Sequence, residues 1–235
     1  VKFVVTREEL KSEYAIGKQE TEKLNGFFYY LIYRPLSFYI TPLIMNLGIK
    51  PNAVTFLTLL IVLLMPVSLI YENSSYLIIA FLGILYCVLD CVDGTMARHM
   101  GLSSSLGMYL DSVFGKFYQI MLIFLILALE YQATSTFNHI HVILSVASAL
   151  MFFWASDARC YYKLNIKKNS LSIMSGKGRA YSIFVSSIDL LPFAIILGHF
   201  VGFMLISYLV FGYYLSVFVG TQISIITGCV NADQQ

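Results

Sequence analysis

Residues 89–116 read LDCVDGTMARHMGLSSSLGMYLDSVFGK, and three aspartates in this stretch raise the first question about the chain. Asp90 and Asp93 are three residues apart, which places both side chains on one face of a helix. Asp111 follows a short serine-rich segment that predicts a turn, so a second helix would carry it back toward the first two acids. One helical turn after Asp111, where a fourth acid would complete the face, the chain has Gly115.

The composition of the chain favours a membrane protein. Of the 235 residues, 58% are hydrophobic and 12% are charged, and the mean hydropathy is +0.77. Soluble domains carry charge on roughly 25% of their residues, so this chain has too few charged groups to cover a water-exposed surface. The net charge of +2 gives no indication of a nucleic-acid partner.

Six apolar stretches of the length that a bilayer requires, about 20 residues, follow the first fifty residues. Upstream, residues 26–47 are aromatic and apolar but contain Arg34, Pro35 and Pro42, which favours a helix lying in the membrane interface over a simple span. We therefore predict an all-α integral membrane protein with six transmembrane helices preceded by an amphipathic interfacial helix. The predicted spans are residues 53–71, 76–98, 105–130, 139–157, 181–198 and 202–226.

The domain division follows from the same pattern. Residues 1–50 are expected to form a cytosolic arm and the interfacial helix, and residues 51–235 are expected to form the six-span domain. Pro51 marks a break, and Asn52 is expected to cap the helix of the first span. Glycines at 198, 202, 212 and 220 favour close helix packing in the last part of the chain.

The distribution of lysine and arginine predicts the orientation of the chain in the membrane. Cytosolic loops of membrane proteins carry an excess of positive charge. With six spans, the basic residues of the N-terminal arm, Arg98 at the turn after the second span and the basic residues of the loop 159–179 all fall on one side, and the opposite loops contain neither lysine nor arginine. We therefore predict that both termini and the site around Asp90 are cytosolic.

The three aspartates predict a metal site. Carboxylates within a membrane span are unfavourable and by default mark function, and three that converge would repel one another unless a cation lies between them. Hard divalent ions take carboxylate oxygens, and Mg²⁺ commonly bridges them to substrate phosphates. Gly94 permits close approach of a ligand, Ala97 keeps the groove open, and Arg98 offers a forked donor for phosphate oxygens. The serines at 103–105 can cap the next helix or meet an anion.

The same stretch resembles the signature of the CDP-alcohol phosphotransferases, D-x-x-D-G-x-x-A-R followed by G-x-x-x-D-x-x-x-D. The fourth aspartate of that signature falls on Gly115. The six-span layout and the sequence PNAVT at 51–55 also resemble the family, so the likeness extends over nearly the whole chain. The matching signature positions are Asp90, Asp93, Gly94, Ala97, Arg98, Gly107 and Asp111.

The resemblance implies a transferase of phospholipid or related phosphodiester biosynthesis. Such an enzyme moves a phospho-alcohol from a CDP-linked alcohol, commonly CDP-diacylglycerol, to an acceptor and releases CMP. Mg²⁺ or Mn²⁺ would be bound by the three aspartates, and the chain would form a homodimer among the membrane lipids. The implied nucleotide-binding residues are Gly94, Ala97, Arg98, Ser104, Gly107, Asn52 and Thr55, and the implied acceptor-phosphate residues are Arg159, Lys177, Arg179 and Lys116.

Gly115 changes what the resemblance implies about catalysis. In the family the fourth aspartate is the proposed general base, and glycine has no side-chain group that accepts a proton. In one hypothesis the acceptor needs no strong base, as with a phosphate, phosphonate, carboxylate or amine, and the basic loop favours an anionic one. In a second hypothesis another residue is the base, the candidates being Asp189, His99 and Asp157. In a third, the chain is an inactive homologue that binds CDP-alcohol and metal without turnover.

Overall fold

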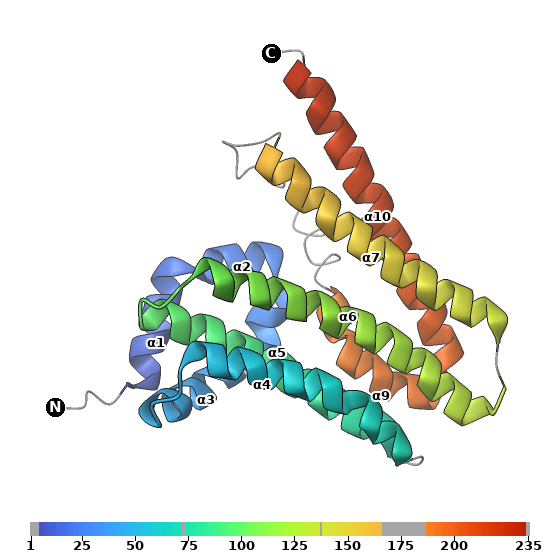
Figure 1. The fold of residues 1–235 in the computed structure, drawn as a ribbon, viewed down its shortest axis with the longest axis horizontal. Coiled ribbons are helices and arrows are strands. Elements are labelled where there is room, and N and C mark those ends of the chain that lie inside the picture. Colours follow the sequence, from blue (N-terminus) through green and yellow to red (C-terminus); the bar gives the residue numbers. More distant parts are fainter. Residues whose placement is uncertain (1–4, 72–73, 137, 166–186, 234–235) are drawn as a thin grey trace. The chain divides into compact units, whose positions relative to one another are not determined.

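The protein is described by a computed structural model over residues 5–71, 74–136, 138–165 and 187–233. Within these ranges the chain is helical and contains no strand, which confirms the predicted all-α fold class (Figure 1). The helices are α1 (Arg7–Gly17), α2 (Gln19–Asn25), α3 (Arg34–Asn46), α4 (Pro51–Leu64), α5 (Ser75–His99), α6 (Ser105–Thr134), α7 (His139–Asn165), α9 (Leu191–Val201) and α10 (Phe203–Asp233). Shorter helical turns are formed by Tyr29–Tyr33, Met65–Ile70 and Ser187–Leu190.

Five helical segments in the described part of the chain are long and apolar enough to cross a bilayer, so the chain is a multi-pass membrane protein. The predicted span 181–198 begins outside the described residues, and its described part consists of a short helical turn and α9, a shorter apolar helix. The count of six spans therefore stays a prediction. The five segments are Pro51–Ile70, Ser75–His99, Ser105–Thr134, His139–Tyr161 and Phe203–Thr227.

The starts of α4 and α6 differ in how well the sequence predicted them. Helix α4 begins at Pro51 after an extended Lys50, so Asn52 lies inside the first turn and the prediction that it caps the helix is wrong. Proline fits the first helical position because its fixed φ suits the helix and its missing N–H would be unpaired there anyway. At α6 the expected serine cap is confirmed, since Ser104 Oγ accepts a hydrogen bond from the Gly107 N–H at 3.0 Å.

The chain folds into two compact units. The first unit comprises Val1–Leu122 and Arg179–Ile196, and the second comprises Ile123–Gly178 and Leu197–Gln235. The division at residue 50, between an arm and a six-span domain, stays a prediction.

Helix α5 is the central element of the first unit. Helices α3 and α4 both pack against it (Figure 1). Its buried side chains include Ile79, Tyr86 and Val92. A Cβ atom at Gly83 would lie only 3.0 Å from Pro192 Cγ, so glycine permits the first turn of α9 to approach α5. The helix that carries two of the motif aspartates is therefore fixed by packing on several sides.

Helix α3 buries polar side chains and exposes apolar ones. Arg34, Ser37 and Thr41 are buried, whereas Leu36 and Leu43 are exposed. Residues three or four apart share one helical face, so the exposed apolar residues form a stripe, which also includes Tyr39. This arrangement is the one expected of the predicted interfacial helix, whose apolar face would meet lipid while its polar face contacts protein.

The second unit is organised around α7 and α10, which pack against each other (Figure 1). A buried polar network ties the end of α6 to both helices. The Nδ1 atom of His141 pairs with Glu130, and the Ser207 hydroxyl donates a hydrogen bond to Glu130 Oε2 at 3.4 Å. Ionisable side chains within spans usually pair with one another in this way, because an unpaired charge in hydrocarbon is unfavourable. The network therefore joins three helices at one level of the unit.

Candidate metal and nucleotide site

The three motif aspartates come together in the first unit. One ligand oxygen from each of Asp90, Asp93 and Asp111 can be chosen so that all three lie within 4.8 Å of one another. Asp93 is buried, Asp90 is half-buried and Asp111 is exposed, so the cluster reaches from the interior of the unit to its surface. All three donors are carboxylate oxygens, the ligands that Mg²⁺ and other hard divalent cations prefer. The residues present therefore fit a divalent metal ion.

Thr55 orients one of these carboxylates. Its hydroxyl donates a hydrogen bond to Asp93 Oδ2 at 2.7 Å, and the residue is buried on the side of α4 that faces α5. The same hydroxyl lies 3.3 Å from the carbonyl oxygen of Pro51, a longer contact. The sequence placed Thr55 at the edge of the nucleotide. The structure places its hydroxyl against a carboxylate of the cluster, where hydrogen bonding fixes which Asp93 oxygen faces inward.

The start of α6 brings three of the predicted nucleotide residues together. A Cβ atom at Gly107 would lie 3.2 Å from Ser104 Oγ and 3.8 Å from Asn52 Oδ1. Any larger residue at position 107 would therefore crowd the serine that caps the helix. Gly101, with a φ of +64°, lies in the turn from α5 to α6, in the left-handed region where glycine is the default residue. Small residues in this turn leave polar groups accessible beside the aspartate cluster.

Gly94 and Arg98 form a second part of the site. A Cβ atom at Gly94 would lie 3.4 Å from Arg98 Nη1, so the absence of a side chain gives the guanidinium room one turn along the helix. Arg98 Nη2 lies 3.5 Å from Thr95 Oγ1, and the arginine is exposed, while Ala97 beside it is half-buried. Only Nη2 makes this contact, so the rest of the exposed guanidinium remains available to bind a phosphate group.

Sequence reasoning missed a buried ion pair beside the motif. In the sequence Arg34 indicated only an interfacial helix, but its side chain is buried and pairs with Glu22 through Nη2 and through Nε, the latter at 3.0 Å. Arg34 Nη1 also donates to the carbonyl oxygen of Cys91 at 2.9 Å and to Thr95 Oγ1 at 2.8 Å. An arginine in an otherwise aromatic stretch was the one signal that could have indicated this role, because such a residue requires a partner.

The environment of Glu22 favours its charged form. Burial by itself would raise the pKa of Glu22, but hydrogen bonds and charge from Arg34, a hydrogen bond from Tyr14 and the charge of Lys18 outweigh it and lower the pKa to about 2. The Tyr14 hydroxyl donates to Glu22 Oε2 at 2.6 Å, and Lys18 Nζ lies 3.0 Å from Oε1. The N-terminal arm therefore contributes a carboxylate that holds Arg34 against the motif helix.

Gly115 is half-buried and has room for a Cβ atom. A Cβ atom added there would have one neighbour within 4 Å, the Tyr86 hydroxyl oxygen at 3.8 Å, which is an ordinary van der Waals distance. Tyr86 is buried and stacks on Tyr118, with ring centroids 3.9 Å apart. The position where the resemblance predicts a fourth aspartate is thus beside a phenol hydroxyl.

The other candidate residues lie in separate surroundings. His99 Nδ1 is 2.7 Å from Glu13 Oε2, which ties the end of α5 to α1. The carbonyl oxygen of Asp189 accepts a hydrogen bond from the Tyr33 hydroxyl. Asp157 and Arg159 are on α7 in the second unit. Lys116 is half-buried on α6, whereas Lys177 and Arg179 lie outside the described residues.

Comparison with known families decides the assignment. The sequence model of a family described as CDP-alcohol phosphatidyltransferase matches residues 48–221, which is well over half of the chain. The chain belongs to this family. The match includes the whole aspartate cluster and the helices that carry it, and CDP-alcohol phosphatidyltransferases are transferases of phospholipid synthesis. Among curated proteins, none matches the sequence.

Proposed function

We propose that this CDP-alcohol phosphatidyltransferase transfers a phospho-alcohol from a CDP-linked alcohol by a reaction that depends on a divalent metal. The observation that carries the proposal is the convergence of Asp90, Asp93 and Asp111 within 4.8 Å, in the order of the family signature. Mg²⁺ or Mn²⁺ bound by these carboxylates would neutralise the diphosphate of the substrate and make its phosphorus more open to attack.

The remaining motif residues bind and orient the donor in this proposal. Thr55 holds Asp93 in the orientation that a metal requires, through the 2.7 Å hydrogen bond. The exposed guanidinium of Arg98 donates to phosphate oxygens. Ser104, Gly107 and Asn52 form a polar edge with little side-chain bulk, which suits the cytidine end of the donor.

We further propose that the acceptor is an anion or another group that is already nucleophilic. Gly115 has no proton-accepting group. A phosphate, phosphonate or carboxylate acceptor loses its proton in water and needs no base at the site. Its negative charge would be met by the basic residues assigned to the acceptor, which are Arg159, Lys177, Arg179 and Lys116.

Release of CMP tests the proposal directly. Purified protein incubated with Mg²⁺ or Mn²⁺, CDP-diacylglycerol or another CDP-alcohol, and a panel of alcohol and anionic acceptors is expected to release CMP, and chelation of the metal is expected to stop the release. Asp93→Asn is expected to lower the rate at least about 10-fold, since loss of a ligand weakens metal binding. Glu20→Gln, at an exposed position of α2, is the control and should keep the full rate.

A second candidate function is supported by Gly115, which has no proton-accepting group. A homologue that has lost its base would retain the aspartate cluster and bind CDP-alcohol and metal without turnover. Isothermal titration with the same CDP-alcohols separates the two functions. Metal-dependent binding without CMP release, for every acceptor tried, would favour the inactive homologue. If the protein does not bind CDP-alcohol and does not release CMP, both candidate functions are contradicted.

We also propose that the site and both termini face the cytosol, on the basis of the lysine and arginine distribution. Cys160 provides a native reporter, because it is exposed near the end of α7, beside the basic loop. A membrane-impermeant maleimide is expected to label Cys160 in inside-out vesicles and to leave it unlabelled in sealed right-side-out vesicles. In a Cys229→Ser background Cys160→Ser should abolish this labelling, because Cys87 and Cys91 are buried. In a Cys160→Ser background, Ser135→Cys, in the exposed turn after α6, should show the opposite sidedness.

A further inference from the structure

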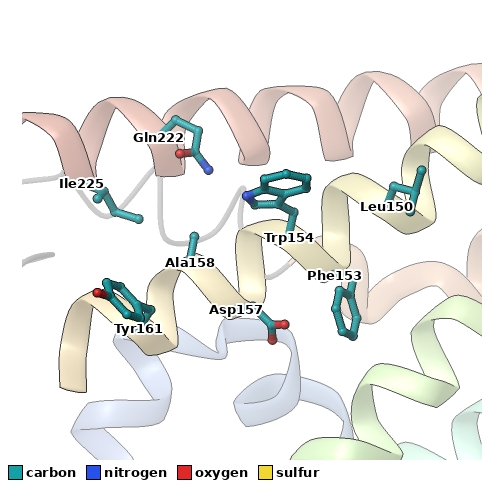
Figure 2. A pocket seen from close by; sticks show the side chains of 8 residues that line it. All are labelled: Leu150, Phe153, Trp154, Asp157, Ala158, Tyr161, Gln222 and Ile225. Atoms are coloured by element: carbon teal, nitrogen blue, oxygen red, sulfur yellow. The ribbon is translucent and has the colours of Figure 1, made fainter. Parts of the chain in front are cut away.

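A groove lies between α7 and α10 in the second unit (Figure 2), and none of the residues that line it belongs to the metal cluster. Its volume is about 450 Å³, which is within the range of sites for small molecules in proteins. Leu150, Phe153 and Ile225 give it apolar walls. Both helices belong to membrane spans, His139–Tyr161 and Phe203–Thr227, so the medium that meets these walls is lipid rather than water.

One polar group in this groove has an unused hydrogen-bonding capacity. Among the described residues, the Nε2 atom of Gln222 is buried and has no hydrogen-bond partner. Figure 2 shows this amide turned from α10 into the gap between the helices, toward the ring of Trp154. An unpaired N–H group in hydrocarbon is unfavourable by several kcal/mol, so an acceptor oxygen is expected at this point.

The depth of Gln222 indicates which acceptor is available. Figure 2 shows it across the gap from Ala158, which stands between Asp157 and Arg159 on α7. Ionisable residues are unfavourable in hydrocarbon, so this part of α7 is near the membrane interface, and Gln222 is near the level where the acyl chains of a glycerolipid join their ester groups. Trp154 and Tyr161, which also line the groove, are residue types that gather at this interface.

We propose that the groove binds one diacyl glycerophospholipid, with an acyl chain along Leu150 and Phe153 and an ester carbonyl oxygen that accepts a hydrogen bond from Gln222 Nε2. A helix from a second copy of the chain fits the apolar walls less well chemically, because its backbone carbonyls are already used within the helix. This site is additional to the metal cluster and does not depend on whether the chain releases CMP.

The single tryptophan of the chain, Trp154, makes the proposal measurable without labels. A phospholipid brominated on its acyl chains quenches nearby tryptophan fluorescence. Titration of the full-length protein in detergent micelles is expected to give saturable quenching that unbrominated phospholipid of the same headgroup competes away. The informative comparison is a diester lipid against its diether analogue, which keeps the phosphate and the chains but lacks the carbonyl oxygens. The diether is expected to bind about 3- to 10-fold more weakly, the value of one hydrogen bond.

Two variants locate the lipid in the groove. Gln222→Leu is expected to weaken diester binding to the level of the diether and to leave diether binding unchanged. Figure 2 shows Ala158 pointing into the gap, so Ala158→Leu should fill the space and weaken binding of both lipids. Ala133→Leu, at an exposed position of α6, is the matched control and should change neither.

Three results would overturn the proposal. Equal affinity of the wild type for diester and diether lipid would show that Gln222 makes no contact with an ester carbonyl. An equal effect of Gln222→Leu on the binding of both lipids would show the same. Quenching that rises in proportion to the brominated fraction without saturating, as for bulk lipid or for a groove filled by a second copy of the chain, would show that the groove holds no specific lipid. The lipid comparison in the wild type needs no variant, so the test stands even where a substitution impairs folding.

Discussion

We expect Gly115→Asp to raise the rate of CMP release with an uncharged alcohol acceptor by about 10²–10⁴-fold, the usual contribution of a general base. The aspartate would stand one helical turn after Asp111, where the resemblance to the family predicts a fourth acid. An alcohol hydroxyl is a poor nucleophile until its proton is removed, so it gains most from the new carboxylate. An anionic acceptor has no proton to lose and is expected to show little gain.

The structure has room for a Cβ atom at position 115. Such an atom would lie 3.8 Å from the Tyr86 hydroxyl oxygen, which is an ordinary van der Waals distance, so the first atom of the new side chain causes no clash. Gly115→Asn is the matched control, because it has the size of aspartate but cannot accept a proton. The measurement is the initial rate of CMP release for wild type, Gly115→Asp and Gly115→Asn with one alcohol and one anionic acceptor.

The two acceptors separate the hypotheses about the native chain. One outcome is that the wild type releases CMP with the anionic acceptor and that Gly115→Asp also releases it with the alcohol. This outcome supports a native acceptor that needs no base. A wild type that is inactive with both acceptors but is switched on by Gly115→Asp supports an inactive homologue. If Gly115→Asn raises the rate as much as Gly115→Asp does, the gain comes from the space that is filled and not from proton removal.

The metal cluster was predictable from the sequence because its geometry is local. Asp90 and Asp93 share a face of one helix through their spacing, and a turn of a few residues returns the chain toward them at Asp111. The structure brings the three together as this spacing predicts. The long apolar helices were predictable for a similar reason, since span length and composition alone indicate them.

Contacts between distant segments were not predictable in this way. Glu22 and Arg34 are joined across two helices, and Arg34 then contacts Cys91, which is 57 residues away in the chain. Nothing in the local pattern of Glu22 distinguishes it from Glu20, which pairs with Lys23 at the surface. Thr55 was associated with the nucleotide through its place in PNAVT, and only the packing of α4 on α5 reveals that its hydroxyl meets Asp93.

Glu22→Gln is expected to lower the free energy of unfolding by about 3 kcal/mol, the usual effect of removing one partner of a buried ion pair. The substitution leaves Arg34 buried without an opposite charge, and Lys18 loses the same partner. The shift in the Glu22 pKa leads to a similar value. Its pKa is about 2 where its ordinary value is 4.5, and each pKa unit corresponds to about 1.4 kcal/mol. Denaturant titration of both proteins in detergent micelles measures the difference.

Glu20→Gln is the matched control, because Glu20 is on the same helix and its bond with Lys23 is exposed, with an expected effect of less than about 1 kcal/mol. An effect of Glu22→Gln as small as that of Glu20→Gln would contradict the role assigned to the buried pair. The activity of Glu22→Gln is a further readout. Arg34 contacts the backbone of α5 at Cys91 and the side chain of Thr95, so loosening it should also disturb Arg98 and weaken binding of the CDP-alcohol.

The pH dependence of stability gives a test of the same pair in the unmodified chain. Since the Glu22 pKa is lower in the folded chain than in the unfolded chain, its contribution is full above about pH 4.5 and is lost as the pH falls toward about 2. The wild type should therefore lose stability more steeply than Glu22→Gln over this interval, and the two curves should converge at its acid end. Parallel curves would show that Glu22 is protonated in the same range in both states, and the arm would then hold Arg34 by contacts other than charge.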